Sequence, residues 1–130
     1  NLNRAFQLCL QGAPLLGVGY NRYFKSGNEM LMDAGAFIRA VEFAAGVEAV
    51  IVGKPSAEFF RQVMASTSAA PQRSLMVGDD VFGDVEGAIN AGIPACLVRT
   101  GKYRKGDEDK VAGEFAVVDS IVQAVEMVLA

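Results

Sequence analysis

The carboxyl-terminal part of the chain alternates short apolar runs with helix-forming segments, and this alternation restricts the fold more than any other feature. The apolar runs predict strands at residues 49–52, 75–77, 95–98 and 115–118, with helices over most of the segments between and after them. Continuous apolar strands that alternate with helices are typical of a parallel sheet covered on both faces. We therefore expect an α/β fold with a Rossmann-like parallel sheet from about residue 48 onward.

The first 46 residues have turn signals of their own and are expected to form a separate small layer. Their pattern predicts a helix over residues 2–11, a short strand within 14–20 and a polar loop over 21–28. A second helix over residues 34–45 would begin after Asp33 as its N-cap and end at Gly46.

Composition excludes several classes of protein. The 130 residues correspond to about one domain, and 12 basic against 15 acidic side chains give a net charge of −3. No basic stripe is present, so we expect no binding to nucleic acid. No apolar run approaches the length that a membrane span requires, so we expect no membrane partner either.

The chain contains no histidine, which excludes Ser-His-Asp and Cys-His nucleophiles and every His-ligated metal site. Cys9 and Cys96 are isolated, and we interpret them as small core residues of a reducing compartment. With no leader pattern at Asn1, a cytoplasmic location is expected. The remaining chemistry depends on carboxylates, lysines and hydroxyls, for which Mg²⁺ is the plausible cofactor.

The strongest candidate site is the segment VGDDVFGD, which places Asp79, Asp80 and Asp84 after a buried strand. Ligands bind at the carboxyl ends of strands in open α/β sheets. Three acids within six residues repel one another unless a cation lies among them, and a hard divalent ion such as Mg²⁺ would relieve this. The competing interpretation is that the first two acids only cap the next helix, expected at residues 84–91.

Lys54 is the second candidate. It follows an apolar strand directly and precedes Pro55, where a lysine can bind phosphate as a point charge. An ordinary exposed lysine is the better interpretation of this motif alone. A right-handed crossover would make the strands before Lys54 and Asp79 neighbours, and both side chains would then face one crevice.

Two segments in this order, VGKPSAEFF and MVGDDVFGDVEGAINAGIPACLVRTGKYRKGDE, resemble the third and fourth motifs of the haloacid dehalogenase superfamily. The form of both motifs is similar to the branch of phosphatases whose α/β cap lies between the second and third motifs. The resemblance implies that residues 1–46 are the second half of this cap. Residues 47–130 would then be the carboxyl-terminal part of the Rossmann-like hydrolase core.

The resemblance also implies roles for the candidate residues. Lys54 would be catalytic and would bind the substrate phosphate. Asp79 would ligate Mg²⁺ directly, Asp84 would bind or orient a metal-bound water, and Asp80 would assist as a further metal residue. The implied activity is Mg²⁺-dependent hydrolysis of a small phosphorylated substrate, which is chiefly positioning and charge stabilisation.

One departure from the family pattern is large. The family's nucleophile, an aspartate in an Asp-x-Asp motif, and the Ser or Thr of its second motif have no counterpart before Lys54. We therefore expect a carboxyl-terminal half-site that is inactive alone, with an open edge at the strand over residues 75–77 and a possible homodimer. The alternative is a non-catalytic metal- or phosphate-binding half-domain that associates with a partner chain. A receiver domain is disfavoured, because its lysine would follow the acids.

Overall fold

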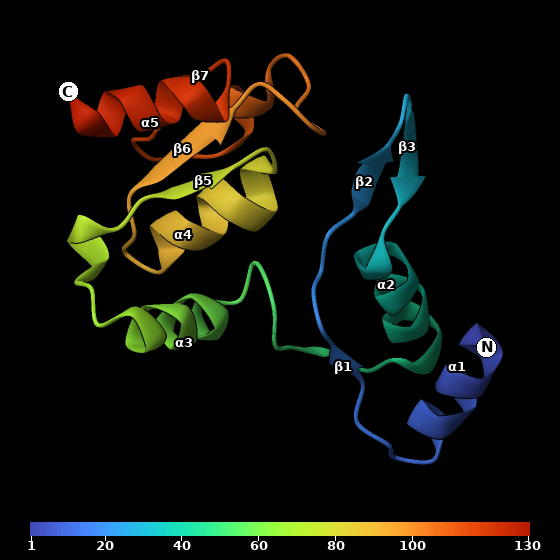
Figure 1. Ribbon diagram of the computed structural model, residues 1–130. Helices are drawn as coiled ribbons and strands as arrows, with labels where there is room; N and C mark the ends of the chain where they lie inside the picture. Colours follow the sequence, from blue (N-terminus) through green and yellow to red (C-terminus); the bar gives the residue numbers. More distant parts are fainter. The chain divides into compact units, whose positions relative to one another are not determined.

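The computed structural model describes all 130 residues, and they form two compact units, residues 1–54 and 55–130 (Figure 1). None of the helices has both the length and the apolar character needed to cross a membrane. The elements of the first unit are α1 (Leu2–Leu10), β1 (Leu16–Gly17), β2 (Tyr23–Ser26), β3 (Glu29–Met32), α2 (Ala34–Ala45) and β4 (Val50–Ile51). Those of the second are α3 (Ala57–Thr67), β5 (Met76–Gly78), α4 (Gly87–Asn90), β6 (Ala95–Val98), β7 (Ala116–Val118) and α5 (Ile121–Leu129).

The first unit has a parallel pair of strands, β1 and β4, in which Leu16 lies opposite Val50. This pairing corrects the expected strand order, because β4 does not neighbour β5 in a sheet: β5 pairs with β6. The division between the units accordingly falls after Lys54, later than residue 46. The assignment of residues 1–46 to a cap and of 47–130 to a hydrolase core stays a prediction.

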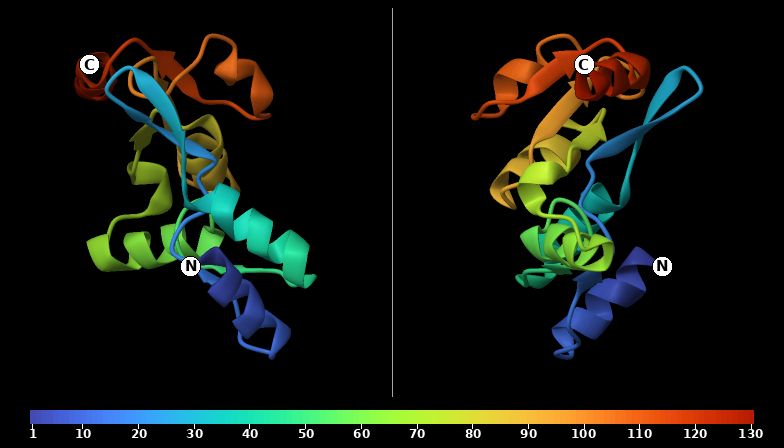
Figure 2. Two further views of the ribbon diagram at one scale, coloured as in Figure 1. Left: turned by 90° about the vertical axis from the view of Figure 1, so that its right-hand side faces the viewer. Right: turned by 60° about the vertical axis from the view of Figure 1, so that its left-hand side comes forward.

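The prediction of a loop over residues 21–28 is wrong, because β2 and β3 form an antiparallel hairpin there, which extends beyond the start of α2 (Figure 2). Ser26 pairs with Glu29 across a two-residue turn whose first residue, Gly27, has φ 57°. Glycine with positive φ at this position is typical of a type II′ hairpin turn. Both strands are largely exposed, so they lack the apolar alternation that reveals a half-buried strand.

Helix α2 begins and ends where the sequence predicts. The Asp33 side chain accepts a hydrogen bond of 2.6 Å from the Ala34 N–H, and Gly46 ends the helix with φ 66°. The buried Glu42 carboxylate, 8% exposed, ties this helix to the neighbouring chain. It accepts hydrogen bonds from the Tyr20 hydroxyl at 2.5 Å and from the Ala49 N–H at 2.8 Å. These two bonds, the one from Tyr20 above all, hold the pKa of Glu42 below its ordinary value.

The second unit contains a parallel sheet in the order β5-β6-β7, which confirms the predicted α/β fold with parallel strands. The four residues of the central strand β6 are all buried and alternate between two cores. Ala95 and Leu97 face a core that includes Phe60 of α3, whereas Cys96 and Val98 face Ala124 of α5. Helices α3 and α4 therefore cover one face of the sheet and α5 covers the other (Figures 1 and 2).

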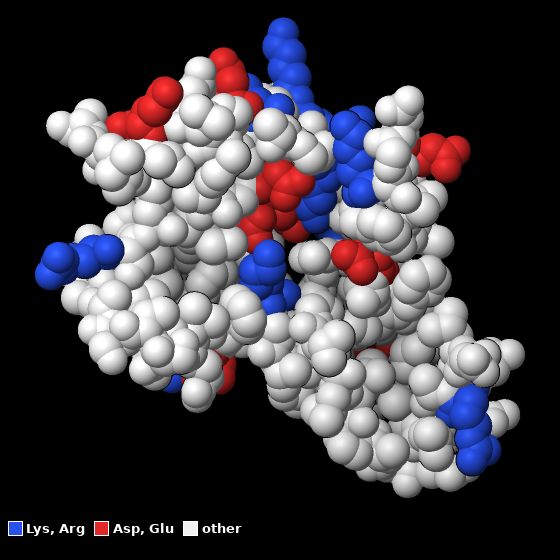
Figure 3. Space-filling model, in the orientation of Figure 1, with Lys and Arg blue, Asp and Glu red and all other residues white.

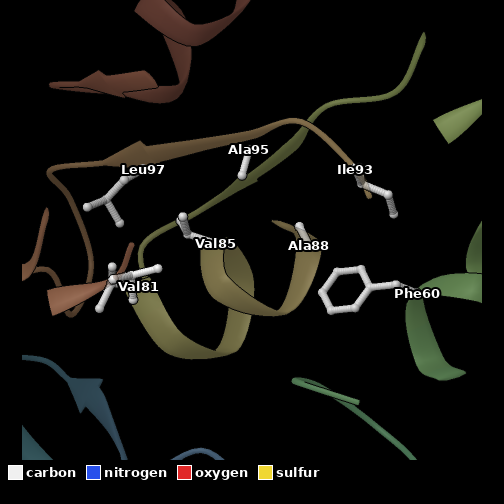
Figure 4. Packing of buried hydrophobic residues seen from close by; sticks show 8 residues of the cluster. Phe60, Val81, Val85, Ala88, Ile93, Ala95 and Leu97 are labelled. Carbon is white, nitrogen blue, oxygen red and sulfur yellow. The ribbon is translucent and has the colours of Figure 1, made fainter. Parts of the chain in front are cut away.

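The larger core is centred on the segment that follows β5. Val81, Val85 and Ala88 are buried beneath Leu97, and the Phe60 ring points toward Ala88 (Figure 4). Parallel sheets require cover on both faces, and this cluster supplies it on one side. The segment that carries the acidic residues is thus anchored by its apolar side chains.

Replacing Glu42 with Gln should lower the free energy of unfolding by about 1–2 kcal/mol near pH 7, because two hydrogen bonds lose a charged acceptor. A lowered folded-state pKa gives stability that is complete above the ordinary Glu value of about 4.3 and is lost as the pH falls through the lowered value. The difference between the two proteins should therefore shrink in acid. Urea unfolding at several pH values measures it, with the exposed Glu48→Gln as control. A pH-independent difference would contradict this account.

Candidate functional site

Lys54 stands at the end of the segment that leaves β4, and its backbone is held from within the first unit. The Tyr20 N–H donates a hydrogen bond of 3.0 Å to the Lys54 carbonyl. A Cβ on the preceding Gly53 would collide with the carbonyl oxygen of Val18, so only glycine permits this close approach of two backbones. The side chain of Lys54 is half-buried, unlike that of an ordinary surface lysine.

The three predicted acidic residues follow β5 in the second unit. Asp84 is the most deeply placed, with 4% exposure, and its Oδ2 accepts a hydrogen bond of 3.2 Å from the Asp80 N–H. A Cβ on Gly78 would collide with this carboxylate, so the glycine that ends β5 makes the room for it. The structure therefore brings Asp80 and Asp84 together at the carboxyl end of the strand, as the sequence predicts.

Asp80 also caps the helical segment that follows it. Its Oδ1 accepts a hydrogen bond of 3.1 Å from the Phe82 N–H, so the helix begins at Val81 and not at residue 84. The capping interpretation is thus confirmed for this residue. The first turn is π-helical, over Val81–Glu86, because the Asp80 carbonyl accepts from both the Asp84 and Val85 N–H groups. Such wide turns frequently occur at functional sites.

Asp79 has a different partner, which lies in the loop that follows β6. Its Oδ2 accepts a hydrogen bond of 2.7 Å from the Lys102 N–H. Gly101 has φ 57°, and a Cβ there would collide with this same carboxylate. Parallel pairing of β5 with β6 brings the ends of both strands to one edge of the sheet, and Asp and Glu side chains gather there in Figure 3.

The Lys102 side chain returns to the acidic segment and was not recognised there from the sequence. Its Nζ lies 2.5 Å from Asp80 Oδ2, and the two side chains are only 12% and 13% exposed. The charged sequence of residues 100–110 predicts a solvated surface loop, and the family resemblance adds a substrate contact from Lys102 or Arg104 as the lesser alternative. The available signal was the position of Gly101-Lys102 just after an apolar strand, the same type of position that drew attention to Asp79.

The rest of this loop is also ordered by its own side chains. Asp107 is 3% exposed and accepts hydrogen bonds from the Arg104 N–H at 2.7 Å and from Lys110 Nζ at 2.6 Å. The Tyr103 hydroxyl donates to Glu108, and burial together with this carboxylate raises the pKa of Tyr103. Hydrogen bonds within the loop therefore fix the backbone that carries Lys102.

The donor chemistry of the acidic segment fits a magnesium ion. Nowhere in the chain do three or more His, Cys, Asp or Glu side chains form a complete metal cage. Mg²⁺ does not require one, because it commonly takes one or two protein carboxylates and completes its shell with water and phosphate oxygens. Asp84, buried against Gly78, and its neighbours supply hard oxygen donors of this kind.

A family model described as HAD-hydrolase-like matches residues 51–124. The chain belongs to the haloacid dehalogenase-like hydrolase family. It is 41% identical over 133 residues to phospholysine phosphohistidine inorganic pyrophosphate phosphatase of Rattus norvegicus, a match that covers 99% of this chain and 49% of the relative. It is also 41% identical over 129 residues to haloacid dehalogenase-like hydrolase domain-containing protein 2 of Bos taurus, covering 98% of this chain and 50% of the relative.

Solved structures of phosphatases share the fold. A p-nitrophenyl phosphatase from Archaeoglobus fulgidus superposes with a TM-score of 0.79 at 25% identity, over 97% of this chain and 51% of that one. A glycerol phosphate phosphatase from Mycobacterium tuberculosis in complex with magnesium gives 0.65 at 28% identity, over 77% and 30%. The chain spans about half the length of the curated relatives it matches.

Replacing Gly101 with Ala should destabilise the chain more than the same change at Gly106. Both glycines have positive φ, so both substitutions cost about 1–2 kcal/mol in backbone strain. Only at position 101 does the new methyl group also displace a carboxylate, that of Asp79, since the nearest atom to a Cβ at Gly106 is Asp109 Oδ2 at 4.0 Å, an ordinary contact. Thermal unfolding of the two variants measures the difference, and equal losses would contradict the close approach described above.

Proposed function

We propose that this chain supplies the lysine and metal-binding part of a Mg²⁺-dependent phosphatase that hydrolyses a small phosphomonoester. The observation that supports this proposal is that Asp79, Asp80 and Asp84 follow the carboxyl end of β5, within a segment that matches the hydrolase family. Relatives that are named phosphatases support the reaction class.

The acidic residues would divide the work of metal binding. We assign direct ligation to Asp79 and the holding of metal-bound water to the buried Asp84, with Asp80 beside them. When bound, Mg²⁺ would supply positive charge to the phosphate oxygens, where negative charge develops during phosphoryl transfer. The backbone hydrogen bonds to the carboxylates of Asp79 and Asp84 fix them before any ligand arrives, which limits reorganisation during the reaction.

Lys54 would bind the substrate phosphate through its ammonium group. An ammonium ion is a compact point charge that suits phosphate oxygens. The hydrogen bond from Tyr20 to the Lys54 carbonyl and the close approach at Gly53 fix the backbone from which this side chain extends. A fixed backbone lowers the entropy that Lys54 loses when it meets the phosphate.

The chain by itself is proposed to be inactive. Phosphatases of the kind it resembles attack phosphorus with an aspartate of an Asp-x-Asp strand, and the 130 residues contain no such strand. A homodimer and a cytoplasmic location also stay predictions.

A second candidate function is a non-catalytic half-domain that binds metal or phosphate and associates with a partner chain. One observation favours association: β5 is an edge strand that pairs on one side only, with β6. Open strand edges recruit further strands. The two hypotheses can be distinguished by experiment. The phosphatase hypothesis predicts Mg²⁺-dependent turnover once a nucleophile is supplied, whereas the association hypothesis predicts only formation of a complex.

Phosphate release from p-nitrophenyl phosphate tests the proposed function. We expect no release by this chain alone, with Mg²⁺ or with EDTA. Mixing it with the half of the rat relative that it does not match should produce release that EDTA abolishes. EDTA-sensitive release by this chain alone would show that one of its own carboxylates attacks phosphorus. A complex of the two halves without turnover would favour the association hypothesis.

Substitutions within that complex assign the residues. Asp79→Ala should abolish Mg²⁺-dependent release, and Lys54→Ala should raise KM and lower kcat, because the phosphate loses a cation in both the bound and the transition state. The exposed Asp109→Ala and Lys105→Ala are the matched controls. Unchanged kinetics at position 79 would refute the metal assignment, and unchanged kinetics at position 54 would make this lysine structural.

The metal site can be measured without turnover. Mg²⁺ should raise the thermal midpoint of the chain, because a ligand that binds only the folded state stabilises it by about 2.7 kcal/mol at a hundred times its Kd. Asp84→Asn should remove most of this gain, whereas Asp109→Asn should retain it. A gain that is the same in both variants would place the metal elsewhere.

A further inference from the structure

Lys102 contacts two of the three predicted metal residues through different atoms. Its backbone N–H donates to Asp79 Oδ2 at 2.7 Å, and its Nζ pairs with Asp80 Oδ2 at 2.5 Å. The side chain is 12% exposed, so the ammonium is largely removed from water at this position. Burying a charge is costly unless it is paired, and Asp80 provides that pairing.

The loop around Lys102 fixes both contacts. Because Gly101 has no Cβ, the backbone at residues 101–102 can lie directly against the Asp79 carboxylate. This close approach places Lys102 beside the acidic segment. On the other side, the buried Asp107 holds the Arg104 N–H at 2.7 Å. The ion pair therefore forms from a backbone fixed by hydrogen bonds, unlike an exposed pair of mobile surface side chains, which contributes little to stability.

The charges explain why a cation is needed there. Asp79, Asp80 and Asp84 lie within six residues of one another, in the segment that follows β5. Backbone N–H groups fix two of the carboxylates, that of Asp84 through Asp80 and that of Asp79 through Lys102. Like charges at such spacing destabilise the folded state. A single ammonium on Asp80 reduces the formal charge of the group from −3 to −2.

We propose that Lys102 is a positioning residue, an internal counter-ion that keeps the acidic segment assembled while no metal is bound and that lowers the affinity for divalent cations by neutralising Asp80. This inference rests on the proposed function for its metal, although the counter-ion role can be tested without any metal. It differs from a substrate contact, because the ammonium is already paired with Asp80 and only 12% of the side chain is exposed. Lys105, in the same loop, is exposed and serves as the comparison.

The first test is a double-mutant cycle in EDTA, with thermal unfolding as the readout. Lys102→Met should lower the midpoint, because Asp80 loses its partner, whereas Lys105→Met should not change it. Asp80→Asn removes the negative charge that Lys102 neutralises. It retains the helix cap, since asparagine is an equally good N-cap. The double variant Lys102→Met/Asp80→Asn should therefore recover much of the midpoint that Lys102→Met loses.

The second test measures Mg²⁺ binding directly by calorimetry. Lys102→Met should bind Mg²⁺ roughly five-fold more tightly than wild type, because one nearby positive charge is removed, and its midpoint should rise more on addition of Mg²⁺. Lys102→Arg keeps the charge and should resemble wild type. Weaker or unchanged Mg²⁺ affinity in Lys102→Met would overturn the claim that Lys102 lowers the affinity for the metal.

The outcomes separate this inference from the proposed function. If no variant and no wild-type protein responds to Mg²⁺, the proposed metal site fails and so does the claim that Lys102 lowers its affinity, while the EDTA cycle still decides the counter-ion role. If Lys102→Met does not fold, the double variant should fold. A double variant that is no more stable than Lys102→Met, or a Lys102→Met midpoint equal to wild type in EDTA, overturns the counter-ion role.

Discussion

Parallel pairing of β5 with β6 is the constraint on which the acidic site depends. Parallel strands end at the same edge of a sheet, so the residues after β5 and those after β6 meet although more than twenty positions separate them in the chain. Asp79 and Lys102 occupy these two positions, and the hydrogen bond between them joins the strand ends. In an antiparallel pair the two ends would lie at opposite edges, and Lys102 would have no access to Asp80.

Glycines set how closely the parts of each candidate site approach. Gly78 admits the Asp84 carboxylate and Gly101 admits that of Asp79, and a Cβ at either position would displace the charged group. Gly53 has the equivalent role before Lys54, where two backbones meet. A carboxylate that packs directly against a glycine backbone has little freedom to move. Electrostatic catalysis requires charged groups that are fixed in this way before the reaction.

The open edge of the sheet and the acidic segment both belong to β5 and the turn that follows it. β5 pairs on one side only, and the helical segment that follows it buries Val81 and Val85 beneath the sheet. Anchoring by these apolar side chains also fixes the two acidic residues of the segment: Asp84 is buried on the same face, against Gly78, and Asp80 caps the first turn. The Lys102 ion pair then offsets part of the repulsion that this arrangement creates. A counter-ion within the protein allows the carboxylates to be placed before a metal binds.

The sequence by itself determined the α/β class, the position of β6, the caps of α2 and the identity of the acidic candidates, because each is a local pattern of apolar runs, capping residues or strand ends. It did not reveal the β2–β3 hairpin, since strands without a buried face carry no apolar alternation. It also misplaced β4, whose two residues suit any parallel partner, and only the tertiary structure decided that this partner is β1. The Lys102–Asp80 ion pair was decided in the same way, because contacts across more than twenty residues depend on strand order, which local patterns do not specify.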